Sequence, residues 1–85
     1  MTQDQVDILS KALRDRLGVE VDAEPVGSRL RYRFAVIAPA FTQMTQLRRQ
    51  DAVWEIVDAT LPREATLDVS LILTFAPGEL AEAGG

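Results

Sequence analysis

Hydrophobic residues recur every three or four positions through the first part of the chain, which is the spacing of one face of an α-helix. The residues of this stripe are Val6, Leu9, Leu13 and Leu17. Thr2 and Gln5 have the spacing of a capping box, and Gly18 can adopt the left-handed conformation that ends many helices. The pattern therefore predicts a helix from Thr2 to Leu17.

The period changes to two after this helix, as in strands that bury one face. Apolar and acidic residues alternate over residues 19–24, and a turn containing Pro and Gly follows at residues 25–28. A second alternating run then has on one face Leu30, Tyr32, Phe34 and Val36, and on the other Arg29, Arg31 and Arg33. The two runs should pair as a hairpin. The second becomes apolar on both faces at Ala35 and Ile37, so it should lie in the middle of the sheet.

A helical pattern follows, but a polar run interrupts it. Thr42 can cap a short helix, and the apolar stripe restarts at Val53 after the polar residues 48–51. Two helices that meet near Gln50 and one bent helix fit this pattern equally well. Pro62 should end the helical segment.

A last strand is predicted from Leu67 to Phe75, again from alternation. The side chains expected to face the core are Leu67, Val69, Leu71, Leu73 and Phe75, and those expected on the other face are Asp68, Ser70, Ile72 and Thr74. The predicted core consists of Leu9, Leu13, Tyr32, Phe34, Val36, Val53, Trp54, Val57, Leu71 and Leu73.

The order helix, strand, strand, helix, helix, strand predicts an α+β fold, a two-layer sandwich in which a three-stranded mixed sheet has its helices on one face. A chain of 85 residues has room for one hydrophobic core. We therefore expect a single domain over residues 1–80 and a flexible tail over residues 81–85.

Composition excludes most catalytic chemistry. The chain has neither Cys nor His, so it lacks thiol nucleophiles, disulfides, and thiolate or imidazole metal ligands. It also lacks a Gly-rich phosphate loop and a Ser-centred nucleophile motif, so we expect no enzyme, no cofactor and no metal. No apolar run reaches the roughly 20 residues of a membrane span, and Met1 leads directly into polar residues, so a cytoplasmic location is expected.

A net charge of −4 means that any binding to nucleic acid requires a local basic surface. The candidates for a surface that binds nucleic acid or an acidic partner are Arg29, Arg31, Arg33, Arg48 and Arg49, with Tyr32 as a stacking group. The alternative is that the arginines of the strand face the acidic residues of the first strand across the hairpin and neutralise them. These acidic residues are Glu20, Asp22 and Glu24.

Several segments of the chain resemble the BolA-like family. Tyr32 to Phe41 is similar to the family's central strand and the aromatic residue of the loop after it, and Thr45 falls where the family has Ser or Thr. Leu47 to Trp54 is similar to the family's basic patch. The stretch from Leu67 to Leu71, continued by Pro77 to Leu80, is similar to the last strand and its end. The order of elements is also that of class II KH domains, but the Gly-x-x-Gly loop of RNA-binding KH domains is absent.

The resemblance implies a binding protein rather than an enzyme. Members of the family act with monothiol glutaredoxins in iron–sulfur cluster handling, and some are DNA-binding regulators of transcription in the stress response. Their cluster ligands are a Cys or His in the loop between the first two strands and a His at the start of the last strand. Here residues 24–28 contain neither type, and Asp68 occupies the second position. Because carboxylates are poor ligands for iron–sulfur iron, the ligand role is not carried over.

We therefore expect a non-enzymatic BolA-like binding or regulatory protein without cluster ligands of its own. It would act through a partner of the monothiol glutaredoxin type or through weak binding to nucleic acid. The alternative is a small self-associating α+β protein. A three-stranded sheet has edges to cover, and a homodimer through the sheet or the helix surface is one way to cover them.

Overall fold

A three-stranded sheet is the frame on which the other elements are arranged. The computed structural model describes residues 1–18 and 20–79, apart from the side chains of residues 28–30. Its elements are α1 (Gln3–Leu17), β1 (Glu20–Val26), β2 (Ser28–Ile37), the 3-10 helix η1 (Pro39–Gln43), α2 (Gln46–Thr60), α3 (Arg63–Thr66) and β3 (Val69–Phe75). The strand order is β1-β2-β3, in which β1 runs antiparallel and β3 parallel to β2.

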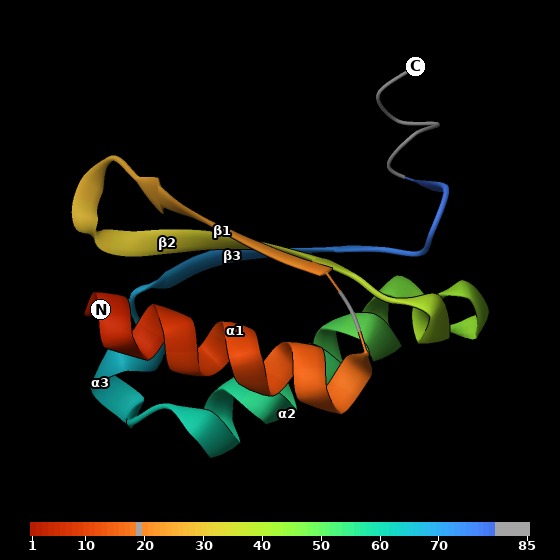
Figure 1. The fold of residues 1–85 in the computed structure, drawn as a ribbon, viewed down its shortest axis with the longest axis horizontal. Coiled ribbons are helices and arrows are strands. Elements are labelled where there is room, and N and C mark those ends of the chain that lie inside the picture. The colour runs from red at the N-terminus through yellow and green to blue at the C-terminus, as the bar shows by residue number, and fades with distance from the viewer. Residues whose placement is uncertain (19, 80–85) are drawn as a thin grey trace.

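The described helices cover one face of this sheet, and none of them lies over the other face (Figure 1). Figure 1 shows α1, α2 and α3 together on one side of the three strands. We call the face toward the helices the inner face. The predicted α+β architecture, with a mixed sheet and β2 as its central strand, is confirmed.

Helix α1 begins and ends at the residues that the sequence indicates. The Thr2 side chain accepts a hydrogen bond from the Gln5 N–H at 3.1 Å, and the Gln5 side chain accepts one from the Thr2 N–H at 2.9 Å. Gly18 has a φ of 64°, and its N–H donates to the Arg14 carbonyl. The predicted capping box and left-handed end are both confirmed.

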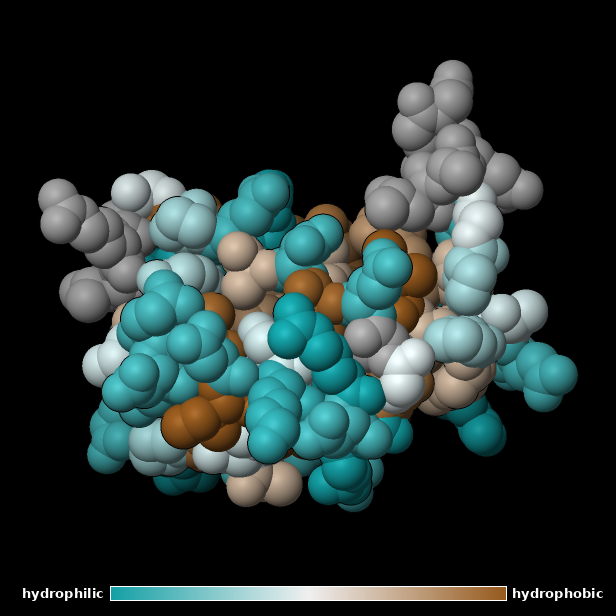
Figure 2. Space-filling model, in the orientation of Figure 1, coloured by the Kyte–Doolittle hydropathy of each residue, from teal (hydrophilic) through white to brown (hydrophobic). Residues whose placement is uncertain are grey.

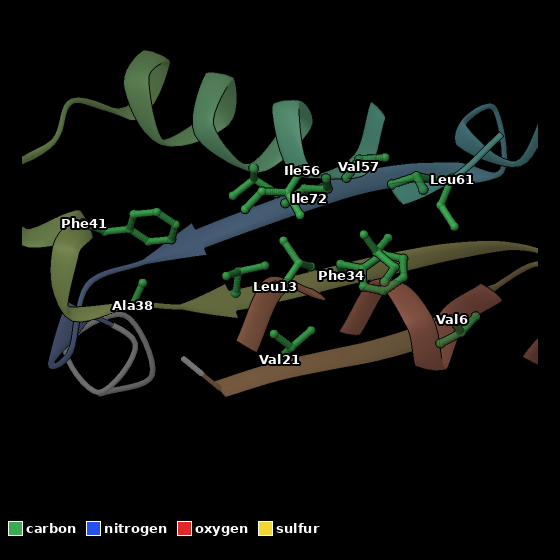
Figure 3. Close-up of a cluster of buried hydrophobic side chains, with 14 of the residues drawn as sticks. Val6, Leu13, Val21, Phe34, Ala38, Phe41, Ile56, Val57, Leu61 and Ile72 are labelled. Carbon is green, nitrogen blue, oxygen red and sulfur yellow. The ribbon is translucent and has the colours of Figure 1, made fainter. Parts of the chain in front are cut away.

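The core fills the space between the inner face and the helices. Its largest fully buried side chains are Phe34, Phe41, Leu9, Leu13, Val36, Val53 and Val57. Figure 3 shows Leu13 and Phe34 between helix and strand, with Val57 on the α2 side of the same cluster. Tyr32 and Trp54, which were expected in the core, are only partly buried and pack against it.

Strand β3 contains one residue more than the segment of β2 that it pairs with. Tyr32 pairs with Val69, but the next residue of β2, Arg33, pairs with Leu71. Ser70 is therefore an extra residue that forms a β-bulge. Beyond a bulge, side chains point to the faces opposite to those that an uninterrupted alternation gives.

The predicted inner face of β3 is consequently wrong beyond this bulge. Ile72 and Thr74 are buried, whereas Leu71 is 47% exposed and Leu73 is partly exposed. Leu67 is also exposed, because it lies at the end of α3 before the strand begins. The alternation in the sequence is the same whether or not Ser70 forms a bulge. The sequence pattern therefore does not reveal that the faces of β3 are reversed beyond it.

Of the two alternatives for the middle of the chain, a single helix is present. Helix α2 begins after Thr45, whose hydroxyl accepts a hydrogen bond from the Arg48 N–H at 3.3 Å. The prediction that Thr42 caps a helix is wrong, because this residue lies within η1, which occupies part of the expected loop. Pro62 separates α2 from α3, as expected of a residue that cannot continue a helix.

Some expectations fall outside the described part of the chain. They concern Val19, the side chains of Arg29 and Leu30, and residues 80–85, which include the predicted tail. Within residues 1–18 and 20–79, no helix combines the length and the hydrophobicity that crossing a membrane requires.

We predict that Phe34→Ala lowers the free energy of unfolding by about 3 to 5 kcal/mol, because it removes a buried aromatic side chain from the middle of the central strand. Urea titration followed by circular dichroism measures this change. Leu47→Ala is the matched control, since Leu47 is 73% exposed on α2. A loss below about 1 kcal/mol for Phe34→Ala would contradict the described register of β2.

Candidate interaction surface

The face of the sheet opposite the described helices carries side chains of different chemistry. The pairing registers of the strands define its rows. They are Glu24, Arg33 and Leu71, then Asp22, Ala35 and Leu73, then Glu20, Ile37 and Phe75. We call these nine residues the outer face.

Each strand gives the outer face a different character. β1 contributes carboxylates that are all exposed, and β3 contributes apolar side chains that are exposed or partly exposed. The central strand carries Arg33 at one end and apolar residues toward the other. An acidic stripe on β1 and an apolar stripe on β3 therefore run along the same face, about 10 Å apart, with β2 between them.

The arginine row is neutralised in part by β1. The Arg33 guanidinium forms a salt bridge with the carboxylate of Glu24, its direct neighbour across the hairpin. This contact agrees with the alternative interpretation of the row. Neither Glu20 nor Asp22 takes part in a salt bridge among the described residues.

A shallow hollow lies in the middle of the outer face. Its volume is about 270 Å³, and its lining residues are Asp22, Glu24, Arg33, Ala35, Leu73 and Phe75. Ala35 is the smallest of these side chains and is flanked by longer ones on β2 and β3, so the surface is lowest there. The hollow has a carboxylate wall on the β1 side and an apolar wall on the β3 side.

The structure does not gather the candidate arginines on one surface. Arg31 and Arg33 are exposed on β2, and Arg48 is exposed on α2, in the other layer of the sandwich. Arg49 is only 5% exposed. The side chain of Arg29 lies outside the described part, and Tyr32 is half-buried against the core rather than beside the exposed arginines.

Arg49 is instead the centre of a buried polar network. Its guanidinium makes two hydrogen bonds to the Glu79 carboxylate, at 2.7 and 3.0 Å. It also donates to the Met44 carbonyl at 3.1 Å and to the Thr74 carbonyl at 3.5 Å, and it lies 5.7 Å from the centre of the Phe41 ring. One side chain of α2 therefore connects η1, β3 and the turn after β3.

Two polar residues of α2 next to Arg49 also bind β3. Gln50 donates to the Ile72 carbonyl at 2.9 Å and accepts a hydrogen bond from the Trp54 indole N–H at 3.2 Å. Gln46 accepts one from the Thr74 hydroxyl at 2.9 Å. Within the polar run 48–51, Arg49 and Gln50 are thus bonded inside the molecule, whereas Arg48 and Asp51 are exposed. Nothing in the local sequence distinguishes the two internal residues from those of a solvated basic patch.

No family model matches the chain, and no curated protein sequence matches it. Solved structures of similar fold include BolA proteins and a BolA domain. BolA1 from Arabidopsis thaliana has a TM-score of 0.71 at 15% identity, with 92% of this chain and 98% of that chain covered. The chain has the fold of BolA proteins.

Two further structures support this assignment of the fold. The BolA domain of SufE1 from Arabidopsis thaliana has a TM-score of 0.67 at 15% identity, with 93% of this chain and 98% of that chain covered. A bol-like protein from Babesia bovis has a TM-score of 0.60 at 17% identity, with coverages of 93% and 92%. The resemblance noted from the sequence is confirmed at the level of the BolA fold.

Asp68 stands where the resemblance to BolA proteins places a ligand histidine. Its carboxylate accepts a hydrogen bond from the N-terminal ammonium of Met1 at 2.5 Å, in a partly buried ion pair. Among the described residues, no three side chains of the types His, Cys, Asp and Glu come together in a group that could hold a metal ion. In this BolA fold, Asp68 therefore binds another part of the chain.

The Arg49–Glu79 pair makes stability depend on acid pH. The hydrogen bonds from Arg49, followed by the one from the Ala76 N–H, lower the pKa of Glu79 from its usual 4.5 to about 2. A carboxylate whose pKa is lower in the folded state than in the unfolded state stabilises the folded state at pH values above the pKa of the unfolded state. This stabilisation is lost as the pH falls from about 4.5 toward 2.

We predict that Glu79→Gln removes this part of the pH dependence. The difference in unfolding free energy between the original protein and Glu79→Gln should be largest near pH 6 and shrink steadily between about pH 5 and pH 2. Urea titrations at several pH values measure it. Glu64→Gln, at an exposed site on α3, is the matched control for the same change of side chain. A constant difference across this range would show that Glu79 is not held ionised by Arg49.

Proposed function

We propose that this chain is a non-enzymatic binding protein of the cytoplasm that acts through a protein partner of the monothiol glutaredoxin type. The observation that carries the proposal is the outer face of the BolA fold, which none of the described helices covers and which combines an apolar stripe with an acidic one. The type of partner comes from the resemblance to BolA-like proteins. The partner would supply every thiolate ligand of a cluster, since this chain has no Cys and no His.

A protein partner explains the surface better than nucleic acid does. Binding to a phosphate backbone needs several unpaired cations on one surface. Here Arg33 is paired with Glu24, Arg49 is internal, and Arg48 is separated from the strand arginines by the thickness of the sandwich. Exposed carboxylates of β1 lie beside Arg33, and they repel phosphate.

We predict that the protein binds a monothiol glutaredoxin with a Kd of micromolar order, measured by isothermal titration calorimetry with the partner in its apo and cluster-loaded forms. Light scattering should show a monomer before mixing. Labelled duplex DNA at roughly 50 and 200 mM salt is the comparison ligand and should bind weakly or not at all. Tight DNA binding at the lower salt would contradict the proposal, as would a stable homodimer that excludes the glutaredoxin.

We also predict that reconstitution with iron and sulfide leaves the isolated protein colourless, because its remaining oxygen ligands do not match the sulfur preference of such clusters. Visible absorption measures this directly. Any cluster formed in the presence of glutaredoxin should have the same spectrum with Asp68→Ala as with the original chain. An absorbing species bound to the chain alone would contradict the prediction, as would loss of the shared cluster in Asp68→Ala.

A further inference from the structure

The outer face carries exposed and partly exposed apolar side chains on two neighbouring strands. The β-bulge in β3 turns Leu71, Leu73 and Phe75 outward, and Ile37 lies beside Phe75 on the central strand. Leu71 is 47% exposed, and the other three are partly exposed. Figure 2 shows hydrophobic surface between hydrophilic side chains on the upper side of the molecule, where the strands lie. We call Ile37, Leu71, Leu73 and Phe75 the apolar strip.

The edges of the sheet are less accessible than its face. The Phe75 carbonyl accepts a hydrogen bond from the Ala38 N–H, so it points toward the β2 side. Because carbonyl directions alternate along a strand, the carbonyls of Ile72 and Thr74 point the other way, to the free edge of β3. Two side chains of α2 already donate hydrogen bonds to these carbonyls: Gln50 to that of Ile72 and Arg49 to that of Thr74. An added strand would have to displace these bonds.

The other edge is also obstructed. On β1, the Val21 carbonyl accepts a hydrogen bond from the Arg14 guanidinium at 3.3 Å. Pro25, in the same strand, has no N–H to offer. A partner therefore reaches the face of the sheet more readily than it extends the sheet by a strand.

The dimensions of the apolar strip match one helix. It spans β2 and β3, which lie about 4.8 Å apart, and its rows from Arg33 to Ile37 extend over roughly 13 Å. A helix is about 10 Å wide and rises 1.5 Å per residue, so about nine residues cover this length. The hollow over Ala35 lies in the middle of that path and has room for a side chain of the size of Leu.

The charges beside the apolar strip determine which side chains a partner helix can place over β1. Glu20 and Asp22 are exposed on β1 and form no salt bridge among the described residues, whereas Glu24 is neutralised by Arg33. A helix seated on the strip places one flank over these two carboxylates. Lys or Arg on that flank would pair with them, and acidic residues there would be repelled.

Resting on the proposed function that a protein partner binds this chain, we propose that the outer face binds an amphipathic helix of that partner. The helix carries an apolar stripe, which packs on Ile37, Leu71, Leu73 and Phe75, and a flank of Lys or Arg, which faces Glu20 and Asp22. One large apolar residue of the helix fills the hollow over Ala35.

The first experiment uses two synthetic helical peptides of the same length, both with Leu at the helical spacing of the apolar stripe. One carries Lys along one flank, and the other carries Glu at those positions. Titration into the isotopically labelled protein, followed by two-dimensional NMR, should show that the Lys peptide binds and shifts the amide signals of residues 33–37 and 71–75. The Glu peptide should bind at least fivefold more weakly. Equal binding of the two peptides, no binding of the Lys peptide, or shifts confined to the helices would overturn the proposal.

The second experiment measures how substitutions on the outer face change the affinity for the Lys peptide. Leu71→Ser should weaken binding of the Lys peptide about tenfold, and Asp22→Lys should weaken it about fivefold. The matched controls are Leu47→Ser and Asp58→Lys, both at exposed sites on α2, and they should leave the affinity unchanged. Circular dichroism of each variant establishes that it is folded. Equal effects of the outer-face and control variants would overturn the proposal.

The same variants test the binding surface independently of the proposed partner type. If glutaredoxin binds but Leu71→Ser and Asp22→Lys do not weaken it, the outer face is the wrong surface and the proposed function stands. If the Lys peptide binds as predicted and glutaredoxin does not, the surface stands and the proposed partner type is wrong. A concentration-dependent dimer that Leu71→Ser disperses would identify a second copy as the occupant and overturn the proposal.

Discussion

The extra residue Ser70 in β3 is the constraint on which both faces of the sheet depend. It places Ile72 and Thr74 against the helices, where the Thr74 hydroxyl meets Gln46 and the backbone of both residues meets donors from α2. By the same geometry it turns Leu71, Leu73 and Phe75 away from the core. The polar contacts of α2 with β3 and the apolar strip on the outer face are thus two results of one irregularity. Removing the bulge would exchange them, with Thr74 on the outside and its partners on α2 left without their bonds.

Arg49 explains how this fold accommodates a charged side chain in its interior. An unpaired buried cation is strongly destabilising, but here the guanidinium has a bidentate carboxylate partner and two carbonyl acceptors. Glu79 in turn accepts a hydrogen bond from the Ala76 N–H at 2.8 Å, which fixes the turn that follows β3. The buried side-chain polar atoms of the described residues all have partners. The network therefore orders the junction of η1, α2 and the end of β3.

The features that the sequence predicts correctly are those that local pattern determines. The ends of α1 follow from Thr2, Gln5 and Gly18. The hairpin follows from the alternation of apolar and polar residues, and the central position of β2 follows from Ala35 and Ile37, which make both of its faces apolar. The faces of β3 and the role of Arg49 depend on partners distant in sequence. Glu79 lies 30 positions from Arg49, and Gln50 lies 22 positions from Ile72. Arg48 and Arg49 are neighbours of the same type, yet only the tertiary contacts decide that one is solvated and the other internal. The outer face is not predictable from the sequence for the same reason, because alternation without the bulge places the apolar residues of β3 in the core.

These contacts also bear on how a BolA fold with this composition recognises another molecule. The position that the resemblance assigns to a ligand histidine is Asp68, which is held by the N-terminal ammonium of Met1. The segment similar to the basic patch contributes Arg49 and Gln50 to internal bonds and leaves Arg48 on the surface. The sheet face opposite the described helices carries apolar side chains on β3 and carboxylates on β1, with β2 between them. Such a surface gains free energy by burying apolar area and gains selectivity from charge, which is the combination that distinguishes one protein partner from another.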